Sequence, residues 1–246
     1  MTSDRLDIHN SDVPVVCRSC EARHRGVCGA LSPEQLVQLS RHTRRRTFDE
    51  TTEVFSTDER AVTYANILRG VVKLEKLMAD GRRQIVGLKF APDFLGRLFR
   101  DQSDCASVAT TGTEICSFPK LLLERIIEEV PAMRERLHNQ ALNELDEARE
   151  WMLALGRKTA SEKVAAFLYF IACHMNPEDN AAKVPEDEVT FDLNLTRAEI
   201  ADFLGLTIET VSRQFTNLRK ARLIEIHHRT HIVVPSIKAL REAGGS

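Results

Sequence analysis

The sequence lacks any long run of apolar residues. No stretch approaches the roughly 20 apolar residues that a membrane-spanning helix needs. Residues 1–10 carry neither the basic cluster nor the apolar centre of a signal peptide. With 11 glycines and 8 prolines among 246 residues, the chain is also too poor in both for a fibrous or low-complexity protein. We therefore expect a cytoplasmic protein with no membrane partner, long enough for two ordinary domains.

Net charge and the common enzyme motifs are scarce as well. The formal net charge is only −2, so affinity for a nucleic acid would have to come from a local basic patch. The chain contains no phosphate-binding P-loop, no His-Glu-x-x-His motif, and no serine, histidine and aspartate set in a recognisable catalytic context. We therefore expect a protein that is not an enzyme.

Cysteine is present in an unusual arrangement. Cys17, Cys20 and Cys28 lie close together in a short polar segment. Because the cytosol keeps thiols reduced, this spacing favours a metal site over disulfides. Either Cys105 or Cys116 would supply a fourth thiolate, and both zinc and iron–sulfur clusters accept such a set. The spacing alone chooses neither the metal nor the fourth cysteine.

A period-two pattern of apolar residues occupies the first half of the chain. Over residues 48–118 apolar and polar residues alternate as in half-buried strands. Asp80 and Gly81 lie between two such stretches and predict a hairpin turn, since glycine accepts a positive φ. Several short strands at this spacing predict an antiparallel barrel or roll. We assign residues 1–30 to a cysteine-rich segment and residues 31–130 to this β-domain.

A helical period follows over residues 131–157. Its apolar residues recur at steps of three and four and form a long, narrow stripe. Such a helix could pack on its own β-domain, but a stripe of this shape fits a partner helix better, so we predict a dimerisation helix. The residues of the stripe are Met133, Leu137, Ala141, Leu145, Ala148, Met152 and Leu155.

The most specific motif occupies residues 196–213, within a predicted C-terminal domain over residues 158–246. Thr196 and Glu199 have the spacing of a capping box at a helix start. Gly205 suits a tight turn, and Thr207 then caps a second helix. The pattern predicts a helix-turn-helix.

The second helix of this motif carries side chains that suit base recognition. Glu209, Ser212 and Arg213 face outward near its N-terminal end, where a recognition helix meets the major groove. Arginine can pair with guanine, glutamate can accept from cytosine, and serine can serve several bases or a phosphate. Residues 223–226 and 231–234 predict two strands around a basic tip, placed as a wing that contacts phosphates. A helical hairpin used only for protein contacts is the alternative, and the matching caps, turn and outward residues favour double-stranded DNA.

The order of these parts resembles the cAMP-receptor-protein superfamily, and within it the oxygen-responsive fumarate-and-nitrate-reduction (FNR) regulators. Residues 204–213, with Glu209-x-x-Ser212-Arg213, are the most specific part of the resemblance. Residues 114–119 are similar to the family segment that holds a fourth cluster ligand, which favours Cys116. The implied fold is α+β, with a cyclic-nucleotide-binding-like β-roll, a long dimerisation helix and a C-terminal winged helix-turn-helix.

The resemblance also implies a function. A [4Fe–4S] cluster would be held by Cys17, Cys20, Cys28 and Cys116. In such regulators oxygen degrades the cluster, the homodimer weakens, and affinity falls for a palindrome of TTGAT half-sites. Thr207, Glu209, Ser212 and Arg213 match the DNA-binding positions. A zinc- or thiol-redox-controlled regulator on the same scaffold is the alternative.

Other implications of the resemblance concern single positions. Glu150 falls where an acidic residue makes dimerisation marginal, and the hairpin at Asp80 is similar to a surface that contacts RNA polymerase. We find no equivalent of the glutamate and Arg-Ser pair that bind a cyclic nucleotide, so no cyclic nucleotide is expected. The seven residues between Cys20 and Cys28 form a longer gap than in some relatives, which predicts a different oxygen lability.

Overall fold

The computed structural model describes residues 13–18, 20–57, 60–110, 112–175, 188–228 and 230–245. The chain forms two compact units. The first contains the chain up to Lys76 and from Val86 to Asp146, and the second contains Leu77–Ile85 and the chain from Glu147 onward. The division falls inside the long helix, whereas the sequence analysis placed it after residue 157.

Short helices open the first unit. Ser32 begins α3 because its hydroxyl accepts from the Gln35 amide, while the Gln35 side chain accepts from the Ser32 amide, and Pro33 suits the first helical turn. The preceding cysteine-rich segment contains helical turns of four residues each. These elements are α1 (Val15–Arg18), α2 (Glu21–His24), the 3-10 helix η2 (Val27–Ala30) and α3 (Pro33–Ser40).

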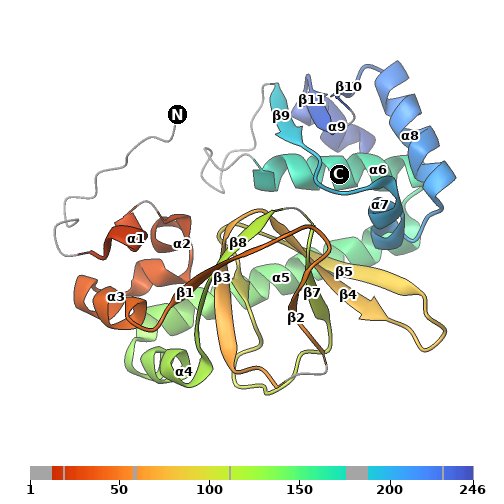
Figure 1. Ribbon diagram of the computed structural model, residues 1–246. Coiled ribbons are helices and arrows are strands. Elements are labelled where there is room, and N and C mark those ends of the chain that lie inside the picture. The colour runs from red at the N-terminus through yellow and green to blue at the C-terminus, as the bar shows by residue number, and fades with distance from the viewer. Residues whose placement is uncertain are drawn as a thin grey trace. The chain divides into compact units, whose positions relative to one another are not determined.

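Two four-stranded sheets follow and confirm the predicted β-domain (Figure 1). The first has the order β1 (Arg44–Phe48), β8 (Thr113–Pro119), β3 (Thr63–Arg69) and β6 (Phe94–Leu95). The second has the order β2 (Glu53–Phe55), β7 (Ala106–Ala109), β4 (Val71–Leu77) and β5 (Arg83–Phe90). The hairpin between β4 and β5 turns at Gly81, whose φ of +86° is the left-handed conformation that the sequence predicted.

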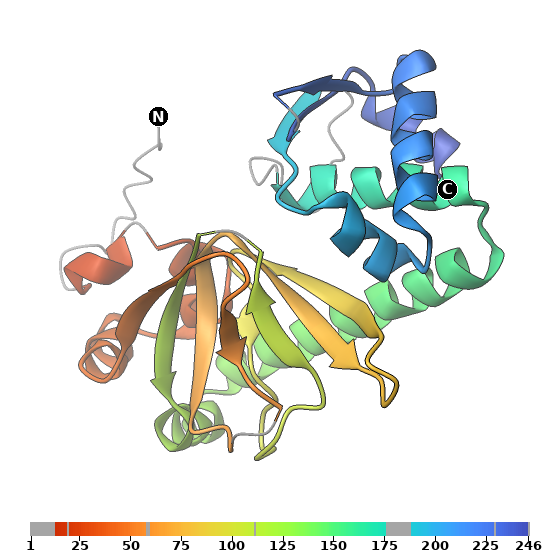
Figure 2. The ribbon, with the colours of Figure 1, turned by 45° about the vertical axis from the view of Figure 1, so that its right-hand side comes forward.

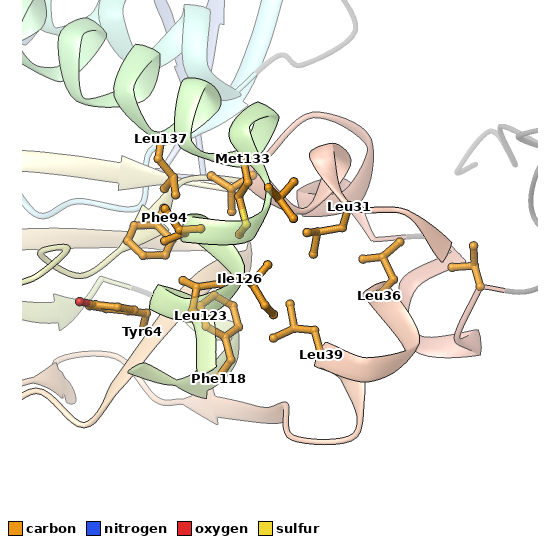
Figure 3. Packing of buried hydrophobic residues seen from close by; sticks show 14 residues of the cluster. Leu31, Leu36, Leu39, Tyr64, Phe94, Phe118, Leu123, Ile126, Met133 and Leu137 are labelled. Atoms are coloured by element: carbon orange, nitrogen blue, oxygen red, sulfur yellow. The ribbon is translucent and has the colours of Figure 1, made fainter. Parts of the chain in front are cut away.

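Both faces of the first sheet are packed. Its inner face joins residues of the second sheet in one core, which includes Ala65, Ile67 and Ile115. Its outer face is covered by the N-terminal helices and by α4 (Lys120–Glu129), and Figure 3 shows Tyr64 and Phe118 there with side chains from these helices. The N-terminal segment is therefore part of the folded β-domain.

The long helix α5 (Pro131–Arg157) has the predicted bounds, but its apolar stripe does not have a single role. Met133 and Leu137 are 0% and 5% exposed and belong to the core over the outer sheet face (Figure 3). Their assignment to a dimer interface is therefore wrong, because these first turns pack on the chain's own β-domain. The remaining predicted positions are exposed: Ala141, Leu145, Ala148, Glu150, Met152 and Leu155.

The second unit holds a small sheet of order β10-β11-β9 and a set of helices (Figure 2). Thr159 and Glu162 form a capping box before the first helix. The sheet includes one strand more than the predicted wing. The elements are α6 (Ala160–Met175), β9 (Val189–Asp192), α7 (Arg197–Leu204), α8 (Ile208–Lys220), β10 (Glu225–His227), β11 (His231–Val234) and α9 (Ile237–Ala243). Every helix in the described part of the chain is too short or too polar to span a membrane.

Candidate functional site

Strand register places Cys116 between two polar side chains. On β8 it lies opposite Arg45 of β1 on one side and opposite Asn66 of β3 on the other. Directly opposed residues of antiparallel strands project from the same face of the sheet. Phe118, two residues along β8, belongs to the outer core, so Cys116, Arg45 and Asn66 project toward the N-terminal helices.

The other three sequence-predicted thiols come from those helices. Cys17 lies in α1, Cys20 immediately precedes α2, and Cys28 lies in η2. The Cys20 amide donates a hydrogen bond to the Cys17 carbonyl at 3.4 Å. Buried Val27 and Leu31 then anchor the segment in the outer core.

Cys17, Cys20, Cys28 and Cys116 line one cavity of about 300 Å³, which we call the thiol cavity. Its wall also contains apolar side chains and several residues with hydrogen-bond donors, namely Arg23, Ser40, Thr43, Arg45 and Asn66. Cys105 lies elsewhere, in the wall of another cavity of about 450 Å³. The structure thus brings Cys116, rather than Cys105, to the three N-terminal thiols.

Burial and mutual repulsion dominate the electrostatics of the thiol cavity. Burial raises the pKa of Cys28 far above its usual range, and the neighbouring Cys20, Cys116 and Cys17 raise it further. Burial and then Cys20 raise the pKa of Cys116 to about 11. The pKa of Cys17 is raised by burial and by Cys20, against an opposing effect of Arg45 and Arg23. Binding of a metal group as thiolates would therefore release protons and would be aided by the two arginines.

The geometry of the donor set bears on which group it fits. In a tetrahedral zinc site, bonds of about 2.3 Å bring the sulfurs within roughly 4 Å of one another. Among the described residues no group of three or more histidine, cysteine or acidic side chains is close enough to hold a single metal ion. Cysteine thiolates bind both a zinc ion and a polynuclear iron–sulfur group, so the donor set of the thiol cavity is compatible with either.

The second unit contains the predicted helix-turn-helix. The Thr196 hydroxyl accepts from the Glu199 amide at 3.2 Å, and the Glu199 carboxylate accepts from the Thr196 amide at 2.8 Å. Gly205 ends α7 with φ +62°, and the Thr207 hydroxyl caps α8 by accepting from the Thr210 amide at 3.2 Å. These contacts fix the turn that separates the two helices.

The outer face of α8 presents the residues predicted to contact DNA. Glu209, Ser212 and Arg213 are exposed, while Val211 and Phe215 on the opposite face are buried. Hydrogen bonds at the helix start, from its own backbone and then from Thr207, lower the pKa of Glu209, so its carboxylate is ionised at neutral pH. Acceptor and donor side chains therefore lie side by side on one exposed helix face.

A groove of about 530 Å³ lies between the end of α8 and the wing. Arg219 and Arg222, at and just after the end of α8, line it together with Glu225 and His227 of β10. Such a surface suits phosphate groups.

Sequence reasoning missed three functional candidates. Nothing in the local sequence singles out Arg45 or Asn66, because only the register of β8 places them beside Cys116. Arg197 lies over the Phe215 ring, 3.4 Å from its centroid, and burial lowers its pKa to about 10. It remains charged at neutral pH and ties α7 to α8.

Comparison with known proteins gives a consistent result along the chain. A family described as the Crp-like helix-turn-helix domain matches residues 162–243. A "probable transcriptional activator" of Rhizobium leguminosarum bv. viciae is 52% identical over 96% of each chain. The "transcriptional activator protein FnrL" of Cereibacter sphaeroides is 39% identical over 95% of each chain. The solved structure of FixK2 from Bradyrhizobium japonicum has a TM-score of 0.73 at 27% identity, and covers 83% of this chain and 98% of that one.

The fold and the helix-turn-helix define a DNA-binding transcription regulator. The chain belongs to the Crp/Fnr family. Its relatives over nearly the full length are transcriptional activators, so the expectation that the protein is not an enzyme is confirmed. The predicted α+β fold is confirmed as well.

Proposed function

We propose that this transcriptional activator responds to oxygen through a [4Fe–4S] cluster held by Cys17, Cys20, Cys28 and Cys116. The observation that carries the proposal is the convergence of these four thiols on one cavity. When bound, the cluster supplies an oxygen-labile iron–thiolate group whose loss is the signal. Arg45 and Arg23 favour the thiolate form of Cys17, so they would help to hold the charge of the loaded site.

The N-terminal segment that carries three of the thiols also makes direct contacts with the long helix α5. Val27 and Leu31 belong to the same core as Met133 and Leu137 of α5. The guanidinium of Arg136, between them on α5, donates to the Gly26 carbonyl at 2.8 Å. Movement of the segment that carries Cys28 would therefore reach the first turns of α5 through direct contacts.

The exposed part of α5 supports a homodimer. Leu145 and Met152 are 45% and 73% exposed, and Leu142 and Leu153 beside them are also exposed. A second copy of α5 would bury these side chains and bring two α8 helices to two half-sites of a palindrome. Glu150 on this exposed stretch would keep the dimer marginal when the cluster is lost, because two like charges would approach each other.

On DNA, Glu209, Ser212 and Arg213 would read a TTGAT-like half-site in the major groove. Thr207 lies beside them at the start of α8, and would hold this recognition helix against the DNA backbone. The exposed turn at Asp80, which Arg82 braces through a hydrogen bond of 2.9 Å, would contact RNA polymerase. The proposal includes no cyclic nucleotide.

The alternative is a zinc- or thiol-controlled regulator on the same scaffold. A thiol switch requires a reactive thiolate, and burial raises the pKa of Cys17, Cys28 and Cys116. Burial of these thiols therefore disfavours a thiol switch, and the metal content of the purified protein distinguishes a zinc site from the cluster.

The test is purification of the full chain without oxygen, followed by exposure to air. We expect a brown protein with about four irons per chain and a visible absorbance that air bleaches. A colourless chain that holds zinc or no metal would overturn the cluster and leave the DNA-binding assignment intact.

A further inference from the structure

Asn66 is a buried amide at the edge of the thiol cavity. It lies on β3, directly opposite Cys116 of β8, and only 1% of its surface is exposed. Its neighbours along the strand, Ala65 and Ile67, belong to the inner core. The register thus points the amide out of that core and toward the N-terminal thiols.

The amide makes one specific contact there. Its Nδ2 donates to the Cys28 Sγ at 3.2 Å, across 38 residues of sequence. Its Oδ1 is buried and has no hydrogen-bond partner among the described residues. Burying an amide with half of its hydrogen-bonding capacity unused is unfavourable, so packing alone does not account for an asparagine at this point.

A cysteine sulfur that carries negative charge would account for an asparagine at this position, because the amide N–H can donate to it. Hydrogen bonds to ligand sulfurs are among the factors that set the reduction potential of an iron–sulfur cluster, and residues behind the ligands orient them. Arg45, on the far side of Cys116, acts on the cavity by charge, whereas Asn66 acts through a directed N–H. The two flank the same β8 cysteine and offer different means of stabilising thiolate charge.

We propose that Asn66 is a positioning residue for the cluster, which donates its N–H to the Cys28 thiolate, raises the reduction potential of the cluster and slows its loss in air. The inference rests on the proposed cluster site. It concerns how long the signal lasts in oxygen, and assigns that property to a residue that is not itself a ligand.

The test compares Asn66→Leu and Asn66→Ala with Asn66→Ser in the full chain, all purified without oxygen. Leucine keeps the volume and removes the donor, while alanine and serine differ only by a hydroxyl donor. We expect the leucine and alanine variants to lose visible absorbance in air about fivefold faster or more, because a hydrogen bond to a charged group is removed. Their reduction potential should fall, and serine should recover part of both changes.

Leu68→Ala is the matched control. Leu68 lies on the same strand and lines the same cavity, and its truncation should change the potential and the air lifetime less than either Asn66 variant, because it removes volume but no hydrogen bond. Thermal unfolding of each variant without oxygen separates loss of fold from loss of the hydrogen bond.

The outcomes separate the two claims. A loaded wild-type chain whose leucine and alanine variants keep its potential and lifetime would overturn the role of Asn66 and leave the cluster standing. Equal effects of Leu68→Ala would also overturn it, because cavity opening would then explain the result. A wild-type chain without iron would overturn the cluster and this inference together.

Discussion

Cys116 owes its place in the thiol cavity to the register of β8 with its two neighbours. That register aligns it with Arg45 and Asn66 and directs it to the face covered by the N-terminal helices. Cys105, only eleven residues earlier, lines another cavity. Two cysteines that local sequence could not distinguish are thus separated by the way the strands pair.

The two cysteines offer a matched pair of variants. Cys116→Ala removes one of the four thiols of the cavity and should abolish retention of the cluster, since the remaining donors cannot complete the set. Cys105→Ala should retain iron at the wild-type level. Iron and sulfide content after anaerobic purification is the measurement. Equal iron in both variants would remove Cys116 from the site.

Arg213 is exposed on the outer face of α8, and we propose that its guanidinium makes a bidentate contact with a guanine. Arg213→Ala should weaken binding to the palindrome by about 1–3 kcal/mol and relax preference at one base pair of each half-site. Binding titrations with the site and with single-base variants measure both effects.

Arg219→Ala is the comparison for that substitution. Arg219 lines the groove beside the wing. Its loss should therefore weaken binding to all DNA sequences by a similar factor and reduce the salt dependence of that binding. If Arg213→Ala instead weakened binding to every DNA sequence equally, the assignment of Arg213 to base recognition would be contradicted.

At the scale of elements, α5 combines two roles along its length. Its first turns are buried in the outer core through Met133, whereas Met152 is 73% exposed. Trp151, beside that exposed position, contacts Phe167 and Phe203 of the second unit at ring-centroid distances of 6.4 and 4.7 Å. The middle and later turns of α5 therefore pack against the chain on one side and are exposed to solvent on the other.

The same substitution at two places on α5 tests this division. Met133→Ala should lower the free energy of unfolding by about 2–5 kcal/mol, because it empties a filled core position. Met152→Ala should leave that free energy nearly unchanged and weaken self-association by about 1–3 kcal/mol. Chemical unfolding and sedimentation velocity measure the two effects. A stable dimer in the Met152 variant would place the interface elsewhere.

Local patterns predicted the elements better than their partners. The capping boxes and the turn glycine at Gly205 depend on neighbours in sequence, and the structure shows each of them. The apolar stripe of α5 predicted a helix but not which turns pack within the chain, because intramolecular and intermolecular contacts give the same period. The four-residue turns around the N-terminal cysteines carry no periodicity at all, and the contact from Asn66 to Cys28 depends on strand register.

At the scale of the whole molecule, the formal charge of −2 conceals a local surface suited to DNA. Arg213, Arg219 and Arg222 all lie on or beside α8 and the wing in the second unit, whereas the thiol cavity belongs to the first unit. Because binding to two half-sites requires two copies, DNA affinity depends on self-association through mass action. In the proposed function, the contacts from the cysteine segment to α5 would link the state of the thiols to that association.

The most direct test follows three quantities in one anaerobic sample as air is admitted. These are iron content, sedimentation coefficient and affinity for a TTGAT palindrome at fixed salt. The account predicts that iron is lost first, that the dimer then dissociates, and that DNA affinity falls with it. A chain that remains dimeric and binds the palindrome undiminished after its iron has gone would contradict the account.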